Sequence, residues 1–86
     1  MAYRLEIKRK VYRRIRQLPL HVQKRMLAVL KALEQDPRPQ GCKRLQGGEF
    51  YAVRVGDYRI VYSVDDAGQT VTVLRARHRR DVYRGL

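Results

Sequence analysis

The first residues of the chain alternate between apolar and charged side chains. From Tyr3 to Lys8 every second residue is apolar, and a period of two is typical of a strand with one buried face. Next, Val11, Ile15 and Leu18 follow one another at intervals of four and three residues, the spacing of one helix face. The pattern therefore predicts a strand with Tyr3, Leu5 and Ile7 inward. A short amphipathic helix follows, with a basic outer face.

A longer helical pattern begins after Pro19, because proline interrupts one helix and suits the start of the next. It runs from Leu20 to Gln35 and ends before Pro37, since a residue that precedes proline avoids helical backbone. Its apolar stripe consists of Val22, Met26, Val29, Leu30 and Leu33. Because the join between the two helices is short, we expect them to form a helical hairpin.

The second half of the chain has the pattern of strands. A loop over residues 40–48 precedes three apolar-rich runs at 49–55, 58–64 and 69–77. The first two runs are separated by Gly56-Asp57, which predicts a two-residue hairpin turn of type II′. The order β-α-α-β-β-β in a single domain of residues 1–86 predicts an α+β fold. Two helices pack on one face of a small, mostly antiparallel sheet in this fold.

The turn at Gly56-Asp57 also determines which residues oppose one another in the hairpin. Val53 lies opposite Ile60 on an apolar face, which we expect beneath the helices. On the other face Arg54 lies opposite Arg59, and like charges in this position cost a few tenths to about 1 kcal/mol. The pair is either two solvated surface side chains or a site that grips a phosphate. The face expected to be more exposed holds Phe50, Ala52, Arg54, Arg59, Val61 and Ser63.

The composition indicates a polyanionic partner. The chain has 20 Lys and Arg against 8 Asp and Glu, a formal net charge of +12. Fifteen of the cations are Arg, the residue suited to bidentate phosphate contacts. Nucleic acid, anionic lipid or an acidic protein would neutralise such a surface. With no long apolar run, one cysteine and two histidines, we expect a cytoplasmic domain without membrane segment, disulfide, metal or cofactor.

A second basic cluster closes the chain. The ten residues from Arg75 to Arg84 contain five Arg, one His and one Tyr. This mixture suits RNA, whose phosphates meet Arg and whose bases stack on Tyr. A solvated basic tail would have the same composition. His78 is a candidate general base, because a free imidazole titrates near neutrality. The alternative is a structural histidine at a strand end.

Two separated motifs resemble those of RelE-family toxins. Residues 54–62 are similar to the family segment RVGDYRxxY, and residues 78–83 resemble its tail HRxDVY. Leu45-Gln46-Gly47 and the helix end from Leu33 to Pro37 also fit the family pattern. The resemblance implies the toxin of a type II toxin–antitoxin pair, a metal-independent endoribonuclease that cuts mRNA in the ribosomal A site. Its partners would be a cognate antitoxin, mRNA and the ribosome.

The resemblance also implies a site and a reaction. The 2′-OH would attack the adjacent phosphate and leave a 2′,3′-cyclic phosphate, while cations stabilise the developing charge. By position, the site contains Arg54, Arg59, Tyr83 and a strand-end arginine, either Arg77 or Arg79. His78 is the plausible base, because Arg titrates too high, unless ribosomal RNA supplies that group. The further RNA-binding candidates are Lys43, Arg44, Arg75 and Arg80.

One position departs from the family pattern. Some members carry a lysine two residues before the match to Arg54, where this chain has Ala52. The sequence leaves open whether Lys43 or Arg44 compensates. Two other functions also stay open. One is a ParE-like toxin, which shares the fold and inhibits DNA gyrase. The other is a non-catalytic module that binds RNA or the ribosome.

Overall fold

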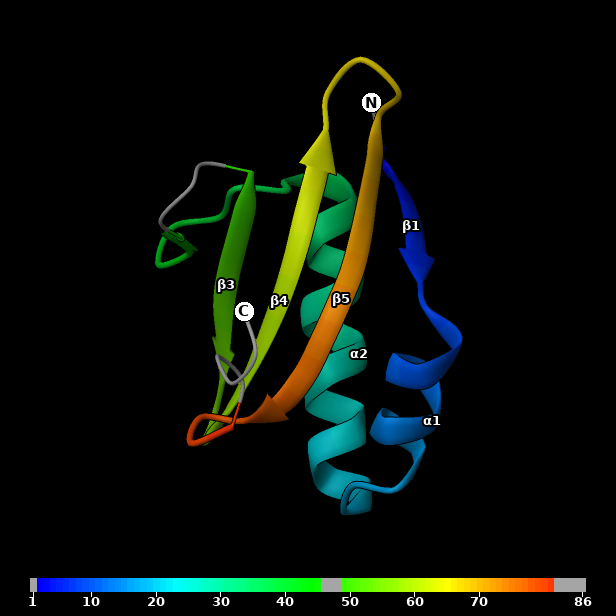
Figure 1. Cartoon of the computed structure of the whole chain (residues 1–86), viewed down its shortest axis with the longest axis vertical. Helices are drawn as coiled ribbons and strands as arrows, with labels where there is room; N and C mark the ends of the chain where they lie inside the picture. The colour runs from blue at the N-terminus through cyan, green and yellow to red at the C-terminus, as the bar shows by residue number, and fades with distance from the viewer. Residues whose placement is uncertain (1, 46–48, 82–86) are drawn as a thin grey trace.

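The structure, a computed structural model, describes residues 2–45 and 49–81. These residues form one five-stranded sheet in the order β1-β5-β4-β3-β2, in which β1 and β5 run parallel and the other neighbours antiparallel. Both helices lie on the same face of the sheet (Figure 1). The predicted α+β class is thereby confirmed. The elements in chain order are β1 (Arg4–Ile7), α1 (Arg9–Arg16), α2 (Leu20–Gln35), β2 (Lys43–Arg44), β3 (Phe50–Val55), β4 (Tyr58–Asp65) and β5 (Thr70–His78).

The join between α1 and α2 is held by a side chain. The amide nitrogen Nε2 of Gln23 donates to the carbonyl oxygens of Arg16 and Leu18, at 3.1 and 2.8 Å. The first carbonyl belongs to the last residue of α1 and the second to the join, and neither continues the hydrogen bonding of the helix. At the far end of α2, Asp36 is extended with φ −144°, as the residue before a proline is expected to be. The predicted bounds of α2 are confirmed.

The core lies between the helices and the sheet. Met26, Leu30 and Leu33 of α2 are buried against a sheet face that includes Ile60 and Tyr62. The Tyr62 ring is fully buried, and its hydroxyl donates to the carbonyl oxygen of Pro37 at 2.7 Å. Burial raises the pKa of this phenol. The predicted inward face of the β3–β4 hairpin is confirmed.

The hairpin register is also as predicted. Val53 pairs with Ile60 and Arg54 with Arg59. Gly56 has φ 59°, a left-handed value at the first turn position that glycine adopts without strain. The φ of Asp57 is not positive. A positive φ at the first turn position together with a non-positive φ at the second is typical of a type II′ turn.

A polar clamp fastens the end of the molecule that carries the β4–β5 turn. Arg38 donates to both carboxylate oxygens of Asp66, at 3.1 and 2.8 Å, and its Nε donates to the Tyr51 hydroxyl at 3.0 Å. The Tyr3 hydroxyl donates to Asp66 Oδ1 at 2.7 Å. We call Tyr3, Arg38, Tyr51 and Asp66 the polar clamp. It connects segments from four different parts of the chain.

One expectation about the sheet is wrong, and a second holds only in part. Residues 43 and 44, placed in a loop from the sequence, form β2 and pair with β3, and two residues are too few for a periodic signal. The outer face of the hairpin is also not uniformly exposed. Ala52 and Val61 are 3% and 0% exposed, because Leu45, which follows β2, packs over them. Leu45 is held there by its amide, which donates to the carbonyl oxygen of Phe50 at 2.8 Å.

Candidate nucleic-acid interface

Three arginines stand in one line across the outer face of the sheet. Arg54 on β3 pairs with Arg59 on β4, and Arg59 pairs with Arg77 on β5. Directly opposed residues have Cβ atoms about 4.5–5.5 Å apart, so the three arginine side chains project from the outer face next to one another. We call Arg54, Arg59 and Arg77 the arginine row. Among residues 2–45 and 49–81, none of the three has a carboxylate partner.

A β-bulge brings Arg77 into the arginine row. The pairing of β4 with β5 shifts by one residue at Leu74. Val73 before the bulge and Ala76 after it both pack into the core beneath the helices. An extra residue inverts the alternation of side chains along a strand. As a result, Arg75 and Arg77 lie on the outer face instead of pointing into the core.

A shallow hollow of about 210 Å³ opens beside the arginine row, and Lys43, Arg54 and Arg59 contribute to its walls. Lys43 is the direct cross-strand partner of Ala52. Lys43 therefore lies on the outer face, beside the β3 position where the family resemblance implies a lysine. Arg44 pairs with Tyr51, whose ring packs against the core, so Arg44 lies on the other face. Of the two candidates, Lys43 is the one beside the row.

The fold separates His78 from the arginine row. His78 pairs with Tyr58, and the two rings meet edge to face with centroids 5.5 Å apart. Tyr58 packs against the core beneath the helices. His78 therefore lies on the helix face of the sheet, opposite to the row. This is the position of the structural histidine that the sequence left as the alternative.

The remaining candidates follow β5. The amide of Arg79 donates to the carbonyl oxygen of Asp57 at 2.8 Å, which holds Arg79 and Arg80 beside the β3–β4 turn. Both side chains are exposed. Of the two candidates for the strand-end arginine, Arg77 is the one that directly opposes Arg59. Tyr83, and Gln46-Gly47 of the Leu45-Gln46-Gly47 match, lie outside the described residues.

Neither a membrane span nor a metal site is found in the part of the chain that the structure describes. No helix there is long and apolar enough to cross a bilayer. The same residues contain no group of three or more His, Cys, Asp and Glu side chains placed to hold an ion.

The sequence matches a family model described as the ParE toxin of the type II toxin–antitoxin system parDE, over residues 5–83. The chain belongs to the RelE/ParE superfamily of type II toxins. Toxin RelG of Mycobacterium tuberculosis is 48% identical to this toxin over 42 residues, which are 49% of this chain and 47% of RelG. This toxin thus matches about half the length of RelG. A putative toxin RelE1 of Methanocaldococcus jannaschii is 27% identical over 98% of both chains.

Solved structures agree with this assignment. The toxin superposes on the archaeal RelE–RelB complex from Pyrococcus horikoshii with TM-score 0.80 and 28% identity, covering 95% of this chain and 100% of that one. For the E. coli RelBE toxin–antitoxin complex the TM-score is 0.78 and the identity 26%, covering 90% and 96%. These likenesses confirm the resemblance to RelE-family toxins and their fold.

Proposed function

We propose that this toxin is a metal-independent endoribonuclease that cuts mRNA in the ribosomal A site. The arginine row carries the proposal. A sheet gains no stability from like charges on three neighbouring strands, whereas a phosphate gains convergent charge-assisted donors. The resemblance to RelE-family toxins, which implies this activity, supports the same proposal. A toxin with this substrate acts in the cytoplasm.

In the proposed reaction the 2′-OH attacks the adjacent phosphorus, the bond from phosphorus to the 5′ oxygen breaks, and a 2′,3′-cyclic phosphate remains. Arg59, the middle member of the row, stabilises the extra negative charge of the pentacovalent phosphorane. Arg54 and Lys43 hold the phosphate on one side. Arg77 stabilises the leaving 5′ oxygen on the other side. The contribution of these residues is electrostatic and requires no metal.

Proton transfer needs a different group, because arginine stays protonated at neutral pH. His78 lies on the other face of the sheet, next to Tyr58. We therefore assign removal of the 2′-OH proton to a group of the ribosomal RNA rather than to His78. The leaving 5′ oxygen takes a proton from water and becomes the 5′-OH of the downstream fragment. For Tyr83 we propose stacking on a base, with its hydroxyl orienting the 2′-OH. Such a stack is worth about 1–3 kcal/mol.

The test is primer extension on mRNA from translating ribosomes mixed with purified toxin. We expect cuts within A-site codons, and upstream fragments that end in a 2′,3′-cyclic phosphate. Arg59→Gln should slow cleavage by about 10²–10³-fold, the usual cost of losing one donor to a transition state. Arg13→Gln removes the same charge from an exposed position on α1 and should cleave normally. His78→Gln should also retain cleavage.

Other outcomes would replace the proposal. Inhibition of DNA gyrase without mRNA cleavage would identify a ParE-like toxin. Binding to ribosomes without cleavage would identify a non-catalytic module. Normal cleavage by Arg59→Gln would remove the arginine row from the reaction.

A further inference from the structure

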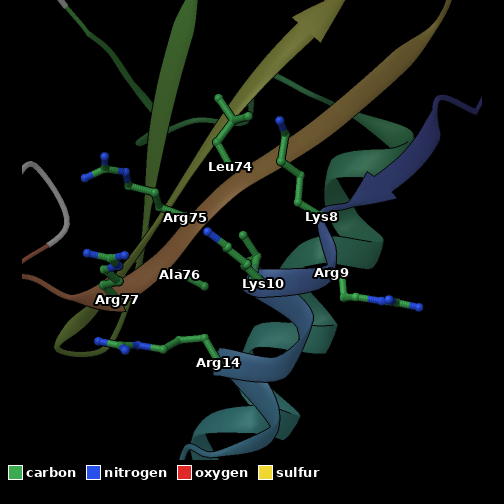
Figure 2. A pocket seen from close by; sticks show the side chains of 9 residues that line it. Lys8, Arg9, Lys10, Arg14, Leu74, Arg75, Ala76 and Arg77 are labelled. Carbon is green, nitrogen blue, oxygen red and sulfur yellow. The ribbon is translucent and has the colours of Figure 1, made fainter. Parts of the chain in front are cut away.

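A second basic surface lies between α1 and β5. It is a groove of about 540 Å³, larger than the hollow beside the arginine row. Figure 2 shows the side chains that line it. Six of them are cations and none carries a carboxylate: Lys8, Arg9, Lys10, Arg14, Arg75 and Arg77. We call this the α1–β5 groove.

The groove exists because β1 is shorter than β5. β1 pairs with β5 only over Thr70–Val73, and the chain then turns into α1. From Leu74 onward a helix lines β5 in place of a strand. The side chain of Val11, on the inner side of α1, is buried in the core. Lys10 and Arg14, one helical turn apart, therefore lie on the side of α1 toward β5. In Figure 2 these two side chains extend to the same side as Arg75 and Arg77.

Part of the positive charge of the groove has no carboxylate partner within the described residues. Lys10, Arg14 and Arg77 have no carboxylate partner among them. Like charges one helical turn apart destabilise a helix, so the arrangement costs stability in the free protein. The lining contains no aromatic side chain on which a base would stack. The groove is therefore suited to the phosphates of a polyanion and not to its bases.

Arg77 connects this groove to the proposed reaction site, because it lines the groove and is also the end member of the arginine row. A continuous line of cations thus runs from Lys43 through the row and into the groove. A nucleic-acid strand, with phosphates at regular intervals, matches such a line. We propose that the α1–β5 groove holds the phosphate backbone of the RNA strand whose scissile phosphate lies on the arginine row. The inference rests on the proposed function.

The test measures binding of uncleavable, fully 2′-O-methylated oligoribonucleotides by fluorescence anisotropy over a range of salt. Lengths of about three and about twelve nucleotides separate a strand that covers only the row from one that also enters the groove. The groove variant is Lys10→Gln with Arg14→Gln. Its matched control is Arg13→Gln with Lys24→Gln, which removes the same charges from exposed positions outside the groove.

We expect the groove variant to weaken binding of the longer RNA and not of the shorter one. Each lost phosphate contact should reduce the dependence of log K on log salt by about 0.7. Because phosphate contacts carry no sequence information, the loss should be the same for different longer RNAs. The control variant should bind both lengths like the wild type.

Equal loss for both lengths, or no loss for the longer RNA, would overturn the proposal. Unchanged RNA binding with weaker binding of the cognate antitoxin would assign the groove to an acidic protein segment. Unchanged oligonucleotide binding with weaker ribosome binding would assign it to ribosomal RNA. Because the probe cannot be cleaved, the binding test is independent of the cleavage test. If the groove variant binds RNA like the wild type, the proposed reaction site is unaffected. If the toxin does not cleave mRNA, the binding result remains valid.

Discussion

At the scale of single residues, Arg59 has a position that stability alone does not explain. It lies between Arg54 and Arg77 on the two neighbouring strands. Among the described residues its guanidinium makes one hydrogen bond, from Nη1 to the carbonyl oxygen of Tyr58 at 3.4 Å, which is a weak interaction. A residue that is repelled on both sides and weakly held is typical of a binding or reaction site.

Replacing Arg59 should therefore make the protein more stable. We expect Arg59→Gln to raise the free energy of unfolding by a few tenths to about 1 kcal/mol for each repulsion that it relieves. Urea denaturation of the variant and the wild type measures the change. A loss of stability would show that Arg59 has a structural role. It would also show that repulsion from Arg54 and Arg77 does not destabilise the fold.

The polar clamp leads to a prediction about pH. Arg38, and next Tyr3, lower the pKa of the Asp66 carboxyl below its usual 3.8. Because the folded pKa is lower than the unfolded one, the clamp stabilises the protein above the unfolded value. That stability is lost as the pH falls through the folded pKa. Asp66→Asn should therefore be less stable than the wild type near neutral pH, and the difference should shrink below about pH 3.8.

Urea unfolding of both proteins at several pH values checks this. Tyr3→Phe is the matched control, because it keeps Arg38, the larger cause of the shift. It should retain most of the pH dependence. A stability difference between Asp66→Asn and the wild type that is independent of pH would exclude the clamp as its source.

At the scale of elements, the helices and the hairpin were predictable because local chemistry determines them. Pro19 and Pro37 set the bounds of α2, and the two-residue turn at Gly56-Asp57 set the register of β3 and β4. The bulge at Leu74 was not predictable, because it depends on how β5 fits β4. Single-sequence alternation has no signal for it beyond a spacing of three between Val73 and Ala76.

In the candidate site, too, some placements follow from local sequence and others depend on the fold. The turn alone predicts that Arg54 and Arg59 oppose each other, and the strand pairing confirms it. The choice of Arg77 over Arg79, and the separation of His78 from the row, depend on the bulge. The place of Lys43 depends on β2, which is two residues long. Each of these placements depends on how the strands pair in the folded protein, and the local pattern of a single sequence does not specify that pairing.

The packing of α2 on the sheet supplies a further prediction. Leu30 is 1% exposed and lies in the core between α2 and the sheet. Leu30→Ala should lower the free energy of unfolding by about 2–5 kcal/mol, the usual cost of a cavity of this kind. Leu27 is on the same helix and 54% exposed, so Leu27→Ala should change stability by less than about 0.5 kcal/mol. Equal effects of the two variants in urea denaturation would contradict the packing described here.

At the scale of the whole molecule, net charge dominates. A net charge of +12 on 86 residues creates a potential that reaches well beyond the surface at low salt. The arginine row and the α1–β5 groove share Arg77, so a partner that covers one covers part of the other. Several of the similar structures are complexes of RelE with RelB. For this toxin we propose a cognate antitoxin whose acidic segment covers this basic surface and excludes RNA from it.

The association rate with that antitoxin should depend steeply on salt. Attraction between a +12 toxin and an acidic segment speeds encounter well above the neutral range of about 10⁵–10⁶ M⁻¹s⁻¹. The screening length shortens from about 30 Å at 0.01 M salt to about 8 Å at 0.15 M, so the rate should fall over this range. Stopped-flow mixing measures the association rate. The dissociation rate should change much less, because contacts formed at short range are screened less.

The Lys10→Gln, Arg14→Gln pair should slow association more than the matched Arg13→Gln, Lys24→Gln pair if the segment passes over the groove. An association rate that does not change with salt would mean that the antitoxin recognises apolar surface, such as the exposed Leu20 and Leu27 of α2, and leaves the basic face open.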